Sequence, residues 1–154
     1  MATLTVTISE SVTLNGRERG SELVNDYSVT EVFHRIVSCP ANQDTTVAVF
    51  KSATNVADGA LDVEDVKYIR VTNLDSTNPI NLSLQIDAGE DDSAADESAT
   101  VLVPAGESFI MGGASDSIAV DDSAATIVTA LHNLESLLVD PIANAVKVEV
   151  FIAS

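Results

Sequence analysis

The sequence predicts an all-β fold, an antiparallel β-sandwich or jelly-roll-like barrel with at most one short helix, in a single domain spanning residues 1–154. Two observations support this fold class. Apolar and polar residues alternate with period two in several segments, and turn-forming residues separate those segments at short intervals. The apolar residues, 45% of the chain, are mainly Val, Ile, Leu and Ala, since aromatic residues make up only 4%. Such a composition suits thin sheets.

Three segments alternate most regularly, and each predicts a half-buried strand. In Thr3–Ser9, Leu, Val and Ile side chains alternate with hydroxyl side chains, as in the strands of sandwiches. The same period recurs in Ile80–Ile86 and in Val146–Ile152. These segments are the firmest part of the β assignment.

Less regular strands are predicted between them, at Val29–Val37, Thr45–Phe50, Val66–Asn73, Thr100–Val103, Ser108–Met111 and Ala125–Leu131. Turn residues separate the strands: Asn15-Gly16 is a hairpin signal, and further turns are expected at Asp58-Gly59, Asn73–Pro79 and Pro104–Glu107. The best helix candidate is Leu131–Leu138, whose leucines share a helical stripe that Pro141 would end, although a strand with a loop fits equally well.

The charge of the chain is strongly negative. There are 24 Asp and Glu residues against seven Lys and Arg, which gives a net charge of −17 at pH 7. Such a field repels phosphate backbones and anionic lipids, so we expect neither a nucleic-acid nor a membrane partner. It favours solubility at high local concentration and repulsion between surfaces that must not adhere.

Two further features bear on where the chain works. Cys39 is the only cysteine, so no intramolecular disulfide can form, which is consistent with folding in a reducing cytosol. The first residues resemble no secretory signal, and no apolar stretch approaches the length of a transmembrane helix. We therefore expect a soluble protein made in the cytoplasm.

One segment is unusually acidic. Asp87–Ser98 lacks large apolar residues and lies between two predicted strands, so it is expected to be an exposed loop. Calcium requires several converging oxygen ligands, and the spacing here does not match a known calcium loop. A solvated loop is the preferred interpretation, and the weak metal candidates are Asp87, Glu90, Asp91 and Asp92, with Asp96 and Glu97 beside them.

No pattern in the sequence indicates catalysis or a cofactor. Nucleophilic catalysis requires a base beside the nucleophile, and only His34 and His132 could supply an imidazole. Neither these histidines nor Cys39 lies in a recognisable catalytic motif, and phosphate-binding glycine loops are absent. We expect no enzyme activity. Glycan binding is disfavoured because there is no Trp, and Tyr27 and Tyr68 are the only tyrosines.

The few basic residues are candidates for contacts between subunits. Arg17 and Arg19 follow the Asn15-Gly16 turn, while Arg35 and Arg70 lie in predicted strands. On so acidic a chain, arginines could pair with carboxylates of a neighbouring copy or of another protein. Pairing within the chain is the alternative, and it is the commoner fate of surface charges.

Taken as a whole, the sequence resembles a family of small structural proteins encoded by tailed phages, especially phages of marine bacteria. The resemblance lies in the order of segments along nearly the full chain and not in any single motif. It is carried by Thr3–Ser9, Val12–Gly16, Lys67–Asp75, Val101–Ile110 and Val146–Ser154. The acidic segment 87–98 has no counterpart in that pattern.

The resemblance implies a β-sandwich virion protein without catalytic residues, assembled in the host cytoplasm. The leading hypothesis is a capsid decoration, or cement, protein that binds the major capsid protein from outside as a homo-oligomer, expected to be a trimer. Many identical weak contacts would add through multivalency. The first alternative is a tail or head–tail connector component that forms a ring. The second is a glycan- or receptor-binding module.

Overall fold

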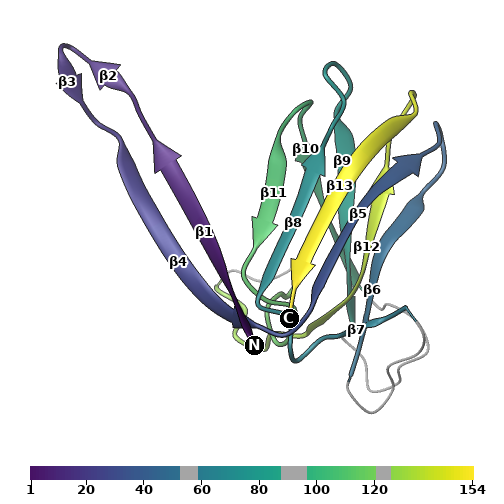
Figure 1. Ribbon diagram of the computed structural model, residues 1–154. Coiled ribbons are helices and arrows are strands. Elements are labelled where there is room, and N and C mark those ends of the chain that lie inside the picture. Colours follow the sequence, from purple (N-terminus) through teal and green to yellow (C-terminus); the bar gives the residue numbers. More distant parts are fainter. Residues whose placement is uncertain (53–58, 88–96, 121–125) are drawn as a thin grey trace.

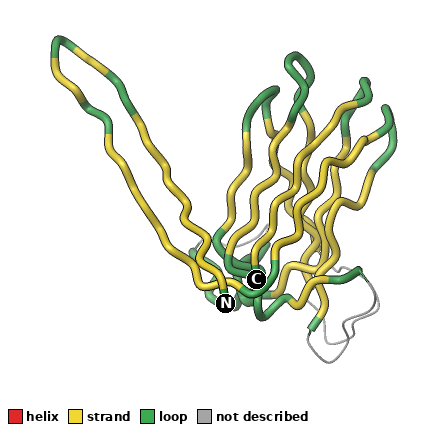
Figure 2. The backbone as a smooth tube through the Cα atoms, viewed as in Figure 1, coloured by secondary structure: helices red, strands yellow, loops and turns green. Residues whose placement is uncertain are grey.

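The computed structural model describes residues 1–52, 59–87, 97–120 and 126–154. The described residues form strands and loops without a helix (Figure 2). Two sheets pack face to face as a sandwich, and a long two-stranded hairpin projects away from them (Figure 1). The predicted all-β class is therefore confirmed, with the two sheets of a sandwich and an additional hairpin.

The two sheets are built from strands that alternate between them along the chain. One sheet has five strands in the order β10-β9-β12-β6-β7, and the other has four in the order β11-β8-β13-β5. The five-stranded sheet comprises β10 (Glu97–Val103), β9 (Ile80–Asp87), β12 (Asn133–Asp140), β6 (Thr45–Lys51) and β7 (Leu61–Asp62). The four-stranded sheet comprises β11 (Ser108–Met111), β8 (Tyr68–Asn73), β13 (Val146–Ala153) and β5 (Val32–Cys39). Neighbouring strands are antiparallel except β6 and β7, which are parallel.

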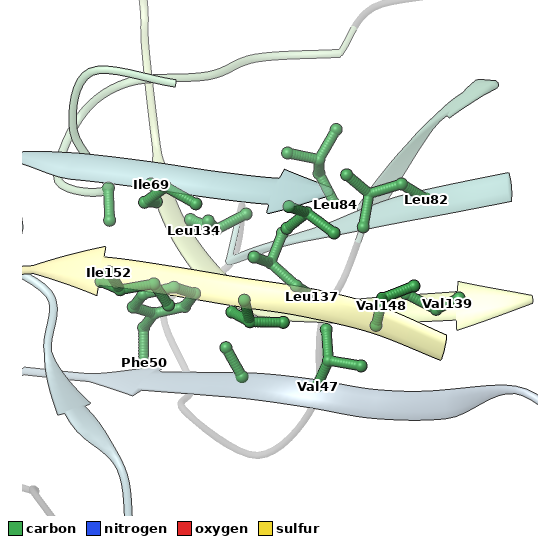
Figure 3. Close-up of a cluster of buried hydrophobic side chains, with 14 of the residues drawn as sticks. Val47, Phe50, Ile69, Leu82, Leu84, Leu134, Leu137, Val139, Val148 and Ile152 are labelled. Carbon is green, nitrogen blue, oxygen red and sulfur yellow. The ribbon is translucent and has the colours of Figure 1, made fainter. Parts of the chain in front are cut away.

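The core lies between the two sheets and consists of aliphatic side chains with one aromatic ring, that of Phe50. Figure 3 shows side chains from both layers interdigitating there. Most strands contribute every second residue, as the pleat requires, whereas β6 and β12 depart from this period at their register shifts. The largest buried contributors include Phe50, Ile69, Ile80, Leu82, Leu134, Leu137, Val148 and Ile152.

One buried polar side chain fastens two loops at one end of the sandwich. Asn73, at the end of β8, has no exposed surface. Its amide nitrogen donates to the carbonyl oxygens of Asn78, Val103 and Pro104 at 2.8, 3.3 and 3.2 Å. Its amide oxygen accepts a hydrogen bond from the N–H of Asp75 at 3.0 Å. The β8–β9 and β10–β11 loops are thus held together by a fully bonded amide, as a buried polar group requires.

The projecting hairpin, called the arm below, consists of residues 2–29. Its two long strands are β1 (Ala2–Glu10) and β4 (Ser21–Val29), and its tip holds β2 (Thr13–Leu14) and β3 (Arg17–Glu18). Asn15 and Gly16 form the turn at the tip, both with positive φ (52° and 72°). Tight hairpin turns favour Asn-Gly for this reason. The predicted turn is therefore confirmed.

The structure differs from the sequence-based expectations in the first strand and around β12. Thr3–Ser9 is a strand, but it belongs to the arm and not to the sandwich. The helix candidate Leu131–Leu138 is wrong, and the alternative of a strand with a loop is confirmed, because residues 133–140 form β12. A register shift at Glu135 of β12 puts Leu134 and Leu137, three residues apart, on the same buried side, and this spacing imitates a helical stripe. The predicted strand Ala125–Leu131 is also wrong within its described residues, 126–131.

Candidate functional site

The arm is a ribbon with two chemically different faces. The register pairs Leu4 with Tyr27 and Ile8 with Leu23, so these side chains share the apolar face, together with Val6. The opposite face carries hydroxyl and acidic side chains and one valine, Val24: its members are Thr3, Thr5, Thr7, Ser9, Glu22, Asp26 and Ser28. An amphipathic ribbon of this kind is stable when its apolar face is covered.

The base of the arm is covered by the sandwich. Leu4, Val6 and Tyr27 pack against a small cluster that includes Tyr68 and Phe151, from β8 and β13. The aromatic rings are in contact, with centroids 6.1 Å apart for Tyr27 and Tyr68 and 6.2 Å apart for Tyr68 and Phe151. The arm is therefore anchored on the outer face of the four-stranded sheet, the face turned away from the core.

The outer half of the arm has no such cover. Ile8 and Leu23, which lie opposite each other on the apolar face, are 42% and 54% exposed. Val12 and Leu14, nearer the tip, are also exposed. Figure 1 shows why: the arm diverges from β11 and the sheet as it leaves the base.

The outer sheet face opposite the arm carries an ordered row of side chains. Pairing across β11, β8, β13 and β5 aligns Ile110, Arg70, Phe151 and His34 in one row. The carboxylate of Glu149 bridges two of them, with Arg70 Nη2 and His34 Nε2 each 2.8 Å from one of its oxygens. The guanidinium carbon of Arg70 lies 5.9 Å from the Phe151 ring centroid. This network fixes the orientation of the row.

The electrostatics of the row centre on Glu149. The hydrogen bond from His34, with a smaller contribution from the positive charge of Arg70, holds the pKa of Glu149 below its ordinary value, and burial opposes them in part. Glu149 is therefore a stable anion between two partners. A neighbouring row, Thr72 and Ser108, is joined by a 2.7 Å hydrogen bond between the two hydroxyl groups.

The arm and the outer sheet face enclose a groove, called the wedge below. Its volume is about 370 Å³. One wall is the segment Leu4–Ile8 of β1, and the other consists of Tyr68, Arg70, Ile110 and Phe151. Ile110 is 46% exposed, so both walls of the wedge carry uncovered apolar surface.

The tip of the arm holds three charged residues with different surroundings. Glu18 accepts hydrogen bonds from the N–H groups of Val12 and Gly20, each at 2.9 Å. These bonds, that from Gly20 first, hold the pKa of Glu18 below its ordinary value. Arg17 and Arg19 contact no carboxylate in the part of the chain that the structure describes. Two guanidinium groups therefore stand unpaired at the far end of a projecting element.

The four arginines predicted to make intersubunit contacts thus separate into three groups. Arg17 and Arg19 lie at the tip and form no ion pair with any residue that the structure describes. Arg70 lines the wedge and pairs within the chain with Glu149. Arg35, on the edge strand β5, stacks at 4.8 Å over the ring of Phe33. The structure brings none of the four close together, except the two at the tip.

The sequence does not predict the exposed apolar surface of the arm. Alternation in Thr3–Ser9 predicts a half-buried strand of the kind found in sandwiches, and it does not indicate a projecting arm. The partner strand β4 was not predicted, because Leu23 and Val24 are adjacent and Asn25-Asp26 follows them, so period-two alternation is broken. The detectable signal was the Asn15-Gly16 turn, which requires a second strand after it.

The residues considered for other chemistry lie elsewhere. Cys39 is buried, and burial raises the pKa of its thiol. His132 forms an isolated bridge with Ile118. The metal candidates Glu90, Asp91 and Asp92, with Asp96, lie outside the described residues, as does the side chain of Asp87, while Glu97 begins β10. The described side chains include no cluster of three acidic, histidine or cysteine residues suited to a metal.

Comparisons with protein-family models, with curated proteins and with solved structures find no match. The described residues include no helix that could span a membrane.

Proposed function

We propose that this chain is a structural protein that works by assembly and that the arm is its docking element. The observation that supports this most directly is the uncovered apolar face of the outer arm, centred on Ile8 and Leu23. Apolar surface at the end of a projecting ribbon favours contact with another protein. An anchored base makes the arm a defined element that offers this surface at a fixed place.

The more specific proposal is a capsid decoration protein of a tailed phage. It rests on the resemblance of the sequence, in the order of its segments, to small virion proteins of such phages. A compact sandwich with a projecting arm suits this role, because the sandwich can lie on the shell while the arm reaches a neighbour. The net charge of −17 would keep decorated particles from adhering to one another.

Electron cryomicroscopy of the phage particles that incorporate the chain tests this function. We expect the sandwich as density on the outer capsid surface, at three-fold or quasi-three-fold positions. A six-fold or twelve-fold ring at the portal or tail would contradict the decoration role and support the connector role. A chain that never co-purifies with particles would contradict both virion roles.

A further inference from the structure

The outer arm requires a cover that the described part of its own chain does not supply. Ile8 and Leu23 form a cross-strand pair on the apolar face, and both remain about half exposed. A two-stranded ribbon on its own is only marginally stable in water. The partner that covers this half therefore has to be available whenever the protein is folded, and another copy of the same chain meets that condition.

The wedge is already suited to a ribbon of this composition. Its inner end holds the base of the chain's own arm, with Leu4 and Val6 packed near Tyr68 and Phe151. Farther out, one wall is Ile8, whose cross-strand neighbour on the apolar face is Leu23, and the other is Ile110 and Arg70. The open part of the wedge thus continues an existing arm–sheet contact.

We infer that the occupant of the wedge is the arm of a second copy of this chain, an inference that rests on the assembly function proposed above. An inserted arm would turn its apolar face toward Ile8 and Leu23. Its other face, rich in threonine and serine, would lie toward the sheet wall, where Arg70 and its partner Glu149 offer charged groups and Ile110 is apolar. The apolar match of the inserted arm is therefore with Ile8 and Leu23 of the other arm.

Charge complementarity also favours a second copy. Arg17 and Arg19 lack a carboxylate partner among the described residues, whereas the chain as a whole carries a net charge of −17. Two copies of net charge −17 repel each other as a whole, but the guanidinium groups at the tip attract carboxylates locally, and a second copy carries a large excess of them. The tip would therefore steer an arm toward a neighbouring molecule.

Two adjacent residues of β4 provide a matched test. Leu23 and Val24 are 54% and 52% exposed but lie on opposite faces of the arm. We would measure the mass of the full chain by sedimentation equilibrium for the wild type, Leu23→Thr and Val24→Thr. Threonine keeps the strand propensity, so both arms should form. We expect the wild type to associate, Leu23→Thr to raise its dissociation constant about tenfold or more, and Val24→Thr to leave it within about threefold.

The results that would contradict the second-copy inference differ from those that would contradict the proposed assembly function. A wild-type chain that stays monomeric at about 100 μM but is incorporated into particles would overturn the second-copy inference and leave the assembly function standing. Equal weakening by both substitutions would also overturn it, since the apolar face would then have no special role. A Leu23→Thr variant that melts earlier than the wild type without any difference in mass would show that the arm folds onto its own sheet.

Discussion

At the residue scale, the buried amide of Asn73 shows how a single side chain can organise one end of the sandwich. It donates three hydrogen bonds to carbonyl oxygens and accepts one from a backbone N–H. No shorter or purely apolar side chain could satisfy these groups. Because both loops run from one sheet to the other, Asn73 fastens two connections between the layers.

Replacing Asn73 with Asp should destabilise the fold. The amide donors are lost, and a carboxylate is placed against carbonyl oxygens that then lack a partner. We expect a loss of at least about 2 kcal/mol in the free energy of unfolding, measured by urea denaturation. Asn144→Asp is the control, because Asn144 is exposed and its amide donates to Asn78 Oδ1 alone. Similar losses in the two variants would contradict the role of Asn73.

Glu149 predicts a dependence of stability on acid. Its pKa in the folded chain is below its ordinary value, so the stability that it contributes is complete above the ordinary value of 4.5. That contribution is lost as the pH falls from there through the lowered pKa. Thermal unfolding of the wild type and of Glu149→Gln should therefore be followed from about pH 5.5 to about pH 3.

We expect the wild type to be the more stable of the two at the upper end of this range. The difference should shrink as Glu149 becomes protonated and its bonds to His34 and Arg70 weaken. A difference that stays constant down to about pH 3 would show that the carboxylate charge contributes nothing to stability.

At the scale of elements, the sequence predicts where strands lie better than it predicts which strands pair and what covers them. β11 matches its predicted bounds, and β13 and β9 each differ by one residue at the end. Alternation identifies a strand because one face is buried, but it does not reveal what buries it. The first strand illustrates this, since its apolar face is covered at the base by the sheet and left open farther out.

The remaining errors have local physical causes. A bulge in β12 moves buried leucines to helix-like spacing, and residues 21–24 of β4 are all exposed, so no buried face imposes alternation there. Of the candidate site, the tip arginines and Arg70 were predicted. The wedge was not, because it depends on the angle at which the arm leaves the sheet.

The geometry of the arm depends on Gly20, which directly precedes β4 and lies against Glu10 at the end of β1. A Cβ atom at residue 20 would collide with the backbone carbonyl of Glu10. Gly20→Ala should therefore open the strand pair at its outer end and speed amide exchange there, with little effect on the melting of the sandwich. Gly112→Ala is the control, since a Cβ atom at residue 112 meets nothing within 4 Å. Unchanged exchange in Gly20→Ala would contradict the described arm geometry.

At the scale of the whole molecule, two parts have different requirements. The sandwich buries its own core and is complete within one chain. The arm is covered only at its base, and its outer half presents apolar side chains and two unpaired arginines. This division suits a protein whose body is a stable module and whose arm makes contacts. The acidic charge limits contacts at other surfaces.

The central claim, that the arm works by packing against another subunit, is tested most directly by hydrogen exchange. Amide exchange of the full chain would be followed at low and at high protein concentration, peptide by peptide. The account predicts that protection of residues 7–10 and 21–25 rises with concentration, whereas β9 and β13 exchange equally slowly at both concentrations. Arm amides that exchange equally fast at both concentrations would contradict it.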